Sequence, residues 1–575
     1  MLGVINIFNI KINKKISLIA FVSLIVLVIL GINLKTNLEN KANQSNKLLI
    51  KESEGKLSEG NLLLYNGEFQ LAIDKYNEID FSKIKDERLI ESLKYIYLSQ
   101  AYYLNNDLEA ASENLEKAKV TNNKDDMVLS LIVANEFLRG NKEEALKLGQ
   151  GYLIETPNNK KLIKTMVGVY IWSNQKEKAV EMIERYAENK NSAYDLAEKA
   201  NMYLLVNDMD NGFKLLKKAW SLDKDEFKIY DVLSHSAIYN KDEMINYINE
   251  LQKNNEKELC YKMWLAKLYS DFEETANGSI NLLKQLKEEN IDNIETKLIE
   301  TVALNNLGKV EEANTLINEV LEETKGDYRV YHSAAWISLA NNDIENAKSY
   351  AYSSIKKNPA YLDNYSFLMP AILNEENELQ KAEKYIYMGR LSELYNIYII
   401  DNLANIYMGR EDGLEKSEEL FNELKIIKSS EPEIIYNLAI IYANSGNVDK
   451  SIETLNECIK LDSQTGKYYR TLGSLLLVSG KQDEGIEKLR EAYALDENDI
   501  LTLNNAGSYY ISFTDDIHKG FYNLQKAFQG INEHTDDYYK EIIEENYNKA
   551  KSIIESIENG KANEKVSIPE FTLLF

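Results

Sequence analysis

The sequence predicts an all-α protein, a solenoid of antiparallel helix pairs that follows one membrane-spanning helix. Three observations point to this architecture. Only 5 of the 575 residues are Pro, and no Pro-, Gly- or Ser-rich linker divides the chain, so helices can follow one another in a single continuous array. Small residues recur at intervals of 34 residues, which indicates a repeat architecture. A long apolar run without charge stands near the N-terminus.

The apolar run covers residues 16–32, ISLIAFVSLIVLVILGI, and contains no charged side chain. With Leu34 added, a helix rising about 1.5 Å per residue approaches the roughly 30 Å of a bilayer core. We therefore expect a short basic segment at 1–15, an uncleaved signal-anchor helix at 16–34 and a polar stalk at 35–52. A cleaved signal peptide is the alternative, because the run is short. The residues after the run lack the small-residue pattern of a cleavage site.

The orientation of this helix is not decided by charge, since lysines stand on both sides of the run. These are Lys11, Lys14 and Lys15 before it and Lys35, Lys41 and Lys47 after it. A short basic N-terminus normally stays in the cytoplasm while a long downstream domain is translocated. We therefore expect a single-pass protein of the cytoplasmic membrane whose large C-terminal domain lies outside the cytoplasm.

Composition excludes several classes of function. The net charge of −25 repels phosphate backbones and anionic lipid, so we expect no nucleic-acid partner and membrane contact only through the N-terminal helix. Cys260 and Cys458 form no CxxC pair, which gives no indication of a zinc site or a disulfide framework.

Small residues hold the same register over most of the chain. They are Ala111, Ala145 and Ala179, then Ala313 and Ala347, and finally Ala439, Gly473 and Gly507. Two antiparallel helices cannot bury their apolar stripes alone, so neighbouring pairs must stack. We expect Ala and Gly where helices touch and larger apolar residues in the grooves between them.

The residues around this register resemble the tetratricopeptide repeat (TPR), which carries W-x2-L-G-x2-Y, then A-x3-F, then P. One unit reads Tyr95-x2-Leu98-Ser99-x2-Tyr102 followed by Ala111-x3-Leu115. Similar units begin at Ile435 and Tyr469, and the closing Pro survives as Pro157 and Pro359. The resemblance implies a right-handed superhelix whose concave face binds protein or peptide.

Between the two helices of a pair, the sequence places Gly or Asn, which tolerate the left-handed conformation that ends a helix. These turns are Asn66-Gly67, Asn105-Asn106-Asp107, Arg139-Gly140-Asn141, Leu307-Gly308-Lys309, Asn341-Asn342-Asp343, Ser445-Gly446-Asn447 and Ser479-Gly480-Lys481.

We place TPR arrays at residues 53–226 and 294–531. Residues 227–293 keep helical periodicity but lose the small-residue register, so they are either diverged repeats or a break in the superhelix. Residues 532–560 are expected to hold a charged helix that caps the open end of the solenoid. The apolar tail at 561–575 either folds back on an exposed repeat face or docks on a partner.

Motifs for catalysis or metal binding are not found. His235, His332, His518 and His534 are isolated in the sequence. Six residues separate Gly473 from Gly480-Lys481, where a phosphate loop has four. The calcium-like segment 207–212 has Lys218 where the bidentate Glu belongs. We therefore expect no enzyme activity, cofactor, metal or small-molecule substrate.

The TPR resemblance singles out the sixth residue of each first helix, which lines the concave face in this family. Members that grip an extended peptide through its terminal carboxylate use two successive Asn residues with Lys and Arg side chains. Asn402 and Asn437 match the Asn pair, and Lys467 matches one basic position. An amide offers both donors and an acceptor to a peptide backbone.

The match to that carboxylate clamp is partial. Tyr398 replaces the first Lys and Thr471 replaces the Arg, with Arg470 adjacent. The candidate peptide-binding residues are therefore Asn402, Asn437, Lys467, Arg470 and Asn505. As a hypothesis, residues 397–510 bind an extended peptide, either from a partner or from the chain's own tail.

The sequence thus predicts a membrane-anchored TPR scaffold or chaperone-like adaptor that binds protein or peptide partners during assembly of envelope or extracytoplasmic complexes. A TPR adaptor or regulator facing the cytoplasm is the main alternative, and topology separates the two. An enzyme with an unrecognised site is a distant third.

Overall fold

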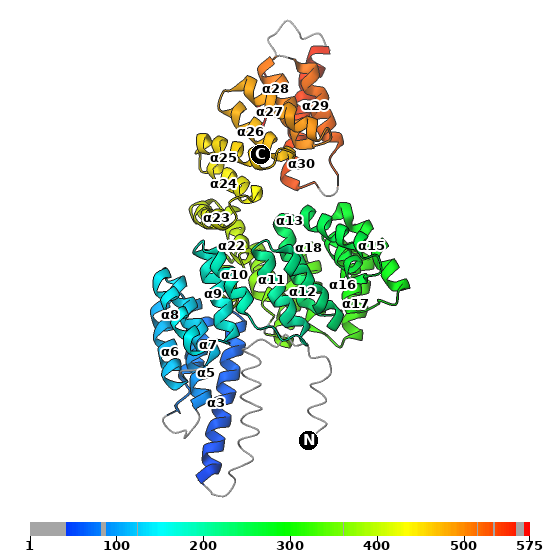
Figure 1. Ribbon diagram of the computed structural model, residues 1–575. Coiled ribbons are helices and arrows are strands. Elements are labelled where there is room, and N and C mark those ends of the chain that lie inside the picture. The colour runs from blue at the N-terminus through cyan, green and yellow to red at the C-terminus, as the bar shows by residue number, and fades with distance from the viewer. Residues whose placement is uncertain are drawn as a thin grey trace. The chain divides into compact units, whose positions relative to one another are not determined.

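The computed structural model describes residues 42–81, 88–122, 125–359, 361–514, 516–532, 535–558 and 568–574. All regular elements in these ranges are helical, which confirms the all-α class (Figure 1). The expected membrane helix at 16–34 and the first part of the stalk lie outside the described residues. Among the helices that are described, none combines the length and apolar character needed to cross a bilayer.

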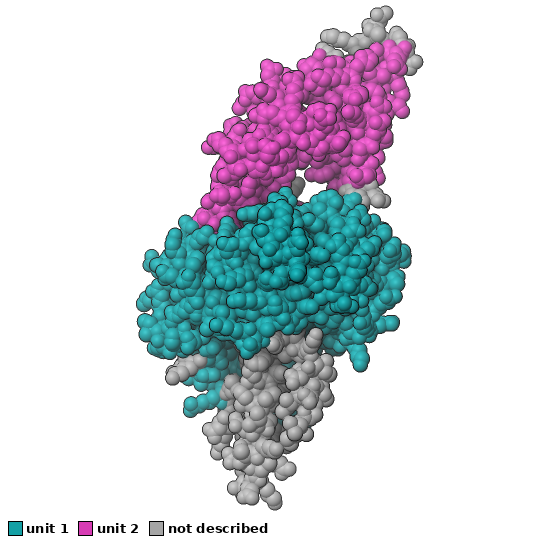
Figure 2. Space-filling view, turned by 45° about the vertical axis from the view of Figure 1, so that its right-hand side comes forward, with its two compact units in different colours: residues 1–406 teal, residues 407–575 magenta. Residues whose placement is uncertain are grey.

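The chain divides into two compact units, residues 1–406 and 407–575 (Figure 2). We expected one continuous array, because no Pro-, Gly- or Ser-rich linker divides the sequence. The boundary falls inside an ordinary helix, α22 (Tyr398–Met408). The amino-acid composition therefore does not indicate the boundary between the two units.

Unit 1 consists of successive helices joined by short turns. They are α3 (Ala42–Tyr65), α4 (Phe69–Asn77), α5 (Arg88–Leu104), α6 (Leu108–Thr121), α7 (Asp126–Leu138), α8 (Lys142–Glu155), α9 (Lys160–Trp172), α10 (Lys176–Arg185), α11 (Ala193–Leu205), α12 (Met209–Leu222), α13 (Phe227–Asn254), α14 (Leu259–Ser270), α15 (Glu273–Glu288), α16 (Ile294–Asn306), α17 (Val310–Glu323), α18 (Tyr328–Ala340), α19 (Ile344–Lys357), the π-helical turn η2 (Asn364–Leu368), α20 (Met369–Glu375), α21 (Leu379–Ser392) and α22.

Unit 2 shows the repeat most regularly, since α24, α26 and α28 begin 34 residues apart. Its elements are η3 (Glu411–Gly413), α23 (Leu414–Ile427), α24 (Pro432–Asn444), α25 (Val448–Leu461), α26 (Gly466–Val478), α27 (Gln482–Leu495), α28 (Ile500–Thr514), α29 (Ile517–Gln529) and α30 (Asp537–Glu558). First helices of 13 residues alternate with second helices of 14 residues from α24 to α27. Helix pairs of this length at this period agree with the architecture that the TPR resemblance implies.

The predicted turns between helices are confirmed. One residue in each has a positive φ between 58° and 88°, namely Gly67, Asn106, Gly140, Gly308, Asn342, Gly446 and Gly480. Each takes the left-handed conformation that stops one helix and reverses the chain. Because Asn tolerates this conformation better than other side chains, it replaces Gly in several turns.

The small-residue register marks the closest helix contacts. All six alanines of the register are fully buried: Ala111, Ala145, Ala179, Ala313, Ala347 and Ala439. A Cβ on Gly473 would lie 2.9 Å from the carbonyl oxygen of Gly485 and 3.0 Å from Cγ of Leu489. Helices α26 and α27 therefore approach more closely than a larger residue permits.

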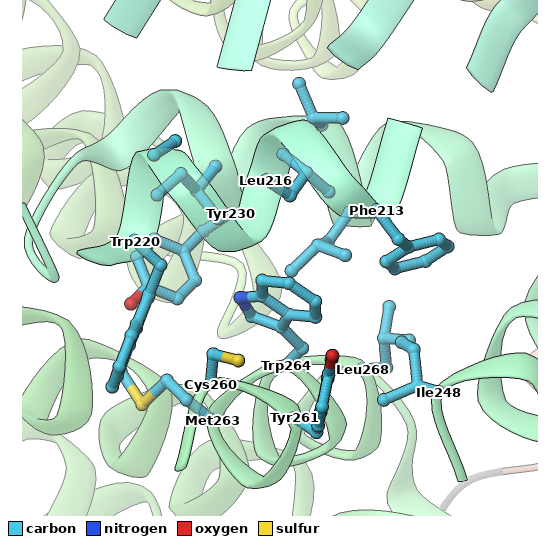
Figure 3. Packing of buried hydrophobic residues seen from close by; sticks show 14 of the residues in the cluster. Phe213, Leu216, Trp220, Tyr230, Ile248, Cys260, Tyr261, Met263, Trp264 and Leu268 are labelled. Atoms are coloured by element: carbon cyan, nitrogen blue, oxygen red, sulfur yellow. The ribbon is translucent and has the colours of Figure 1, made fainter. Parts of the chain in front are cut away.

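Residues 227–293 fold as helices around a core of large side chains. Helix α13 has a non-helical residue at Asn240, with φ −122° and ψ 35°, so it is two helices across a kink. Trp264 of α14 is fully buried and lies near Phe213 and Tyr261, with ring centroids 5.7 and 5.4 Å away (Figure 3). Small residues still lie at the contact of α14 and α15, where the Ser279 hydroxyl donates to the carbonyl oxygen of Ala266 at 2.7 Å.

Unit 1 closes on itself, because helices far apart in sequence are in contact. The Tyr385 hydroxyl donates to the carbonyl oxygen of Tyr65 at 3.1 Å, and Trp172 Nε1 donates to the carbonyl oxygen of Leu394 at 2.7 Å. A Cβ on Gly168 would lie 2.7 Å from the carbonyl carbon of Leu394. The absence of a side chain at Gly168 thus lets α9 reach the segment after α21.

A buried ion network accompanies this closure. Glu198 is fully buried and pairs with Lys164 and, at 3.3 Å, with Lys228. Lys228 pairs in turn with Glu393 at 2.9 Å, and the Tyr395 hydroxyl donates to Glu198 at 2.8 Å. Burial raises the pKa of the Glu198 carboxyl, but the two lysines outweigh it and hold that pKa at about 2.

The first prediction tests the close helix contact at Gly473. Gly473→Leu should lower the free energy of unfolding by about 1–3 kcal/mol, because the new side chain would meet the backbone of α27. Lys481→Ala, at an exposed turn position, should change it by less than about 0.5 kcal/mol. Urea unfolding measures both variants, and equal tolerance would show that the contact is misplaced.

The second prediction concerns pH. Glu198→Gln leaves Lys164 without its carboxylate and leaves the buried Lys228 with Glu393 alone, so we expect a loss of about 3–5 kcal/mol at pH 7. The folded-state pKa lies below the unfolded value of about 4.3, so the stabilisation is complete above that pH and disappears as the pH falls towards 2. The difference in unfolding free energy between the two proteins should therefore shrink from about pH 4.3 to pH 2. A pH-independent difference would contradict this account.

Candidate functional site

The described part of the C-terminal tail, residues 568–574, lies against the repeats of unit 2. Its main chain is hydrogen-bonded by side chains of α26, α28 and α30. Of the two expected fates of the tail, folding back on the repeats is the one observed for these residues. We call the surface of α26, α28 and α30 that these residues occupy the groove of unit 2.

Asn505 of α28 holds both main-chain groups of Leu574. Its Nδ2 donates to the Leu574 carbonyl oxygen at 2.5 Å, and its Oδ1 accepts from the Leu574 N–H at 2.8 Å. Asn505 itself is fully buried. One side-chain amide thus satisfies the donor and the acceptor of a buried peptide residue, whose desolvation would otherwise cost about 1–3 kcal/mol per group.

Asn546 of α30 repeats this arrangement two residues earlier in the tail. Its Oδ1 accepts from the Thr572 N–H at 3.2 Å, and its Nδ2 donates to the Thr572 carbonyl oxygen at 2.8 Å. Lys549 Nζ donates to the carbonyl oxygen of Glu570 at 2.8 Å. Contacts at every second residue are those of an extended peptide that presents one edge.

The amides of the groove also hydrogen-bond one another. Asn546 Nδ2 donates to Asn504 Oδ1 at 3.0 Å, and Asn504 Nδ2 donates to Asn505 Oδ1 at 3.1 Å. Asn505 Nδ2 donates to Ser474 Oγ at 2.7 Å. All four side chains are fully buried, so the network holds each amide in one direction.

Apolar side chains of the tail fill the spaces between the helices. Phe571 is buried against Ile511, Leu524 and Ile553. Leu574 is buried in a cluster with Leu501 and Ile543. The amides hydrogen-bond the main chain, and the apolar clusters pack against side chains. The groove therefore suits an extended segment with apolar residues at the positions of Phe571 and Leu574.

The candidate residues from the sequence have different surroundings. Asn505 lies in the groove, whereas Lys467 pairs with Glu433 at 2.7 Å and Arg470 with Asp499 at 2.6 Å. Asn437 is half-buried on α24. Asn402 belongs to unit 1, where its Nδ2 donates to the carbonyl oxygen of Ser366 at 2.8 Å.

Sequence reasoning missed Asn504, Asn546 and Ser474. A signal for Asn546 does exist, because the inward face of α30 reads Ile543, Asn546, Ala550 and Ile553 at helical spacing. An Asn within an apolar stripe is a polar group that needs a buried partner. The tail supplies that partner.

Comparisons with known proteins add little to this picture. No model of a protein family and no curated protein matches the sequence. Among solved structures, the APC/C hetero-tetramer Cut9–Hcn1 is similar with a TM-score of 0.38 and 13% identity, over 93% of this chain and 100% of that chain. Yeast Tom70 is similar with a TM-score of 0.30 and 14% identity, over 90% of this chain and 99% of that chain.

A third similar structure is Naa15/Naa10 bound to HypK-THB, with a TM-score of 0.37 and 13% identity over 90% of this chain and 94% of that chain. Identities and TM-scores this low do not transfer a function or a partner. The candidate site therefore depends on the geometry of the groove.

The third prediction is that Asn505→Ala releases the tail. Loss of both hydrogen bonds to Leu574 should raise amide hydrogen exchange over residues 568–574 at least tenfold, while helices α24 and α25 keep their protection. Asn456→Ala is the matched control, because Asn456 is an exposed amide on α25 that bonds only the carbonyl of Ile452 within the same helix among the described contacts. Unchanged exchange in the Asn505 variant would mean that this amide does not hold the tail.

Proposed function

We propose that this chain is a membrane-anchored, non-catalytic TPR scaffold that binds extended segments of partner proteins in the groove of unit 2. The observation that carries the proposal is the pair of amides, Asn505 and Asn546, that bind alternate peptide units of residues 568–574. These contacts are made to main-chain groups, so they do not depend on the tail's own side chains. A partner segment with suitably placed apolar residues can make the same bonds.

In this proposal the tail is a resident ligand that a partner displaces. A segment tethered to its own binding site has an effective concentration on the order of millimolar. A free peptide of equal intrinsic affinity therefore competes poorly, whereas a partner with additional contacts succeeds. The tail would thus keep the groove closed to weak or accidental partners.

The membrane part of the proposal comes from residues 16–34 and their flanks. The short basic N-terminus and the long downstream domain favour an orientation with both units outside the cytoplasm. There the scaffold would assist assembly of envelope complexes. An adaptor of the same fold facing the cytoplasm is the alternative that topology tests.

The fourth prediction tests the groove with a peptide. A chain truncated after residue 567 should bind a fluorescent peptide of residues 568–575, IPEFTLLF, at least tenfold more tightly than the full chain, because the resident tail is gone. Asn505→Ala in the truncated chain should weaken this binding at least tenfold, and Asn456→Ala should leave it unchanged. Fluorescence anisotropy measures binding, and circular dichroism checks that the helices persist.

Two results would overturn this use of the groove. One is equal binding of the peptide by the truncated chain with and without Asn505. The other is equal binding by the full and truncated chains, since the tail would then not occupy the site. Excess peptide added to the full chain gives an independent measurement, because it should raise hydrogen exchange in residues 568–574.

The fifth prediction concerns topology. If both units lie outside the cytoplasm, protease added to cells without their wall should degrade residues 53–575 while the membrane stays intact. A cytoplasmic marker protein in the same cells should survive. Complete protection until the membrane is opened would favour the cytoplasmic adaptor instead.

A further inference from the structure

Unit 1 contains a pocket of about 350 Å³ that is separate from the groove of unit 2. Helices α3, α5, α7, α9, α11 and α21 contribute to its walls, together with Tyr365 of η2. Its volume lies within the range of small-molecule sites in proteins, about 300–1,000 Å³. The pocket exists because α21 returns to the first helices of the unit, so it is a product of the closure of unit 1.

Most of the pocket wall is apolar. Aliphatic side chains come from four of the helices and from the segment before η2, namely Leu64, Leu104, Met127, Leu131, Leu362, Met388 and Leu391. Such a wall favours an apolar ligand body by removing its surface from water. Methionine side chains adapt to the shape of a ligand more easily than branched residues do.

One wall carries three lysines of α9, and two of them are already neutralised. Lys160 pairs with Asp195, and Lys164 pairs with the buried Glu198. Lys161 differs, because its ammonium is buried and no group in the described part of the chain hydrogen-bonds it. Burial lowers the pKa of Lys161 to about 7, aided by the charge of Lys164 and only partly offset by Asp125 and Asp126.

Two more buried polar atoms of the same pocket have no hydrogen-bond partner among the described residues. They are the Tyr65 hydroxyl and the side-chain oxygen of Gln100. Roughly 90% or more of the buried polar groups in proteins are paired. The Lys161 ammonium and the Tyr65 hydroxyl are therefore donors that lack an acceptor, which a ligand that reaches them would supply, whereas the Gln100 oxygen can only accept a hydrogen bond.

We propose that this pocket binds a small amphipathic carboxylate, whose anionic head lies on Lys161 and Tyr65 and whose apolar body lies against the leucine and methionine wall. Among the described residues that line the pocket, Lys161 is the one cation without a partner, and it matches one negative charge. A dianionic phosphate would need further cationic donors, and Lys160 and Lys164 are engaged by carboxylates. An ion pair with Lys161 would also supply the partner that this buried ammonium lacks.

From the sequence we expected no small-molecule substrate, but the geometry of unit 1 points to a small-molecule ligand. The proposal is independent of the peptide groove, because all the residues that line the pocket belong to residues 1–406. A negative result in the peptide experiment would not argue against the pocket in unit 1, and a negative result for the pocket would not argue against the peptide groove.

Calorimetric titration of the full chain with dodecanoate, below its micelle concentration, tests the proposal. We expect one site per chain, at least tenfold weaker binding of dodecanol and no binding of acetate. Lys161→Met should reduce dodecanoate affinity at least tenfold while leaving dodecanol affinity unchanged. This variant removes a buried charge and keeps the chain length, so it should fold. Lys147→Met is the control, because Lys147 is 75% exposed on α8 and should not affect binding.

Three results would overturn the proposal. Equal affinity for dodecanoate and dodecanol would describe an apolar pocket with no carboxylate site. Unchanged dodecanoate binding in Lys161→Met would place the head group elsewhere. Tighter binding of dodecyl phosphate than of dodecanoate would assign a different head group. A ligand-dependent rise in melting temperature that is lost in Lys161→Met gives a second readout in its favour.

Discussion

The close contact of paired helices at their small residues is the constraint on which the rest of the structure depends. Neither helix of a pair can bury its apolar stripe without a neighbour. In α28, a Cβ on Gly507 would lie 2.9 Å from the carbonyl oxygen of Gly520, so that face is taken up by α29. Asn504 and Asn505, on the preceding turn, are then available to the tail and to α30.

The tail is as much a part of the interior of unit 2 as it is a ligand. The amides of Asn505 and Asn546 are fully buried, and the main chain of residues 572–574 satisfies them. A partner that displaces the tail must offer the same alternation of donors and acceptors, since unpaired buried amides are costly. The hydrogen bonds that stabilise the interior of unit 2 are thus the same ones that would bind a partner segment.

The contacts that close unit 1 include buried charged groups, whose desolvation costs more free energy than burial of apolar side chains would. The pairs of Glu198 with Lys164 and Lys228 lose hydration on burial, which offsets much of the attraction between their charges, so the network adds less stability than the number of charges suggests. Their directional bonds fix where the segment around Glu393 and Tyr395 meets α11 and α13. Lys164 of this network also lines the pocket that contains Lys161.

The sequence by itself determined the helical class, the 34-residue period and the turns, because these depend on contacts within a pair and on backbone conformations that Gly and Asn tolerate. It also singled out Asn505. Only the tertiary structure decided which amides meet: Asn402 and Asn505 share a repeat position, yet Asn402 bonds the backbone of Ser366 and Asn505 bonds the tail. Contacts such as Tyr65 with Tyr385 depend on small rotations summed over many repeats. The residue pattern within one repeat does not show the total rotation over many repeats. The closure of unit 1 and the unpaired Lys161 could therefore not be predicted from the sequence.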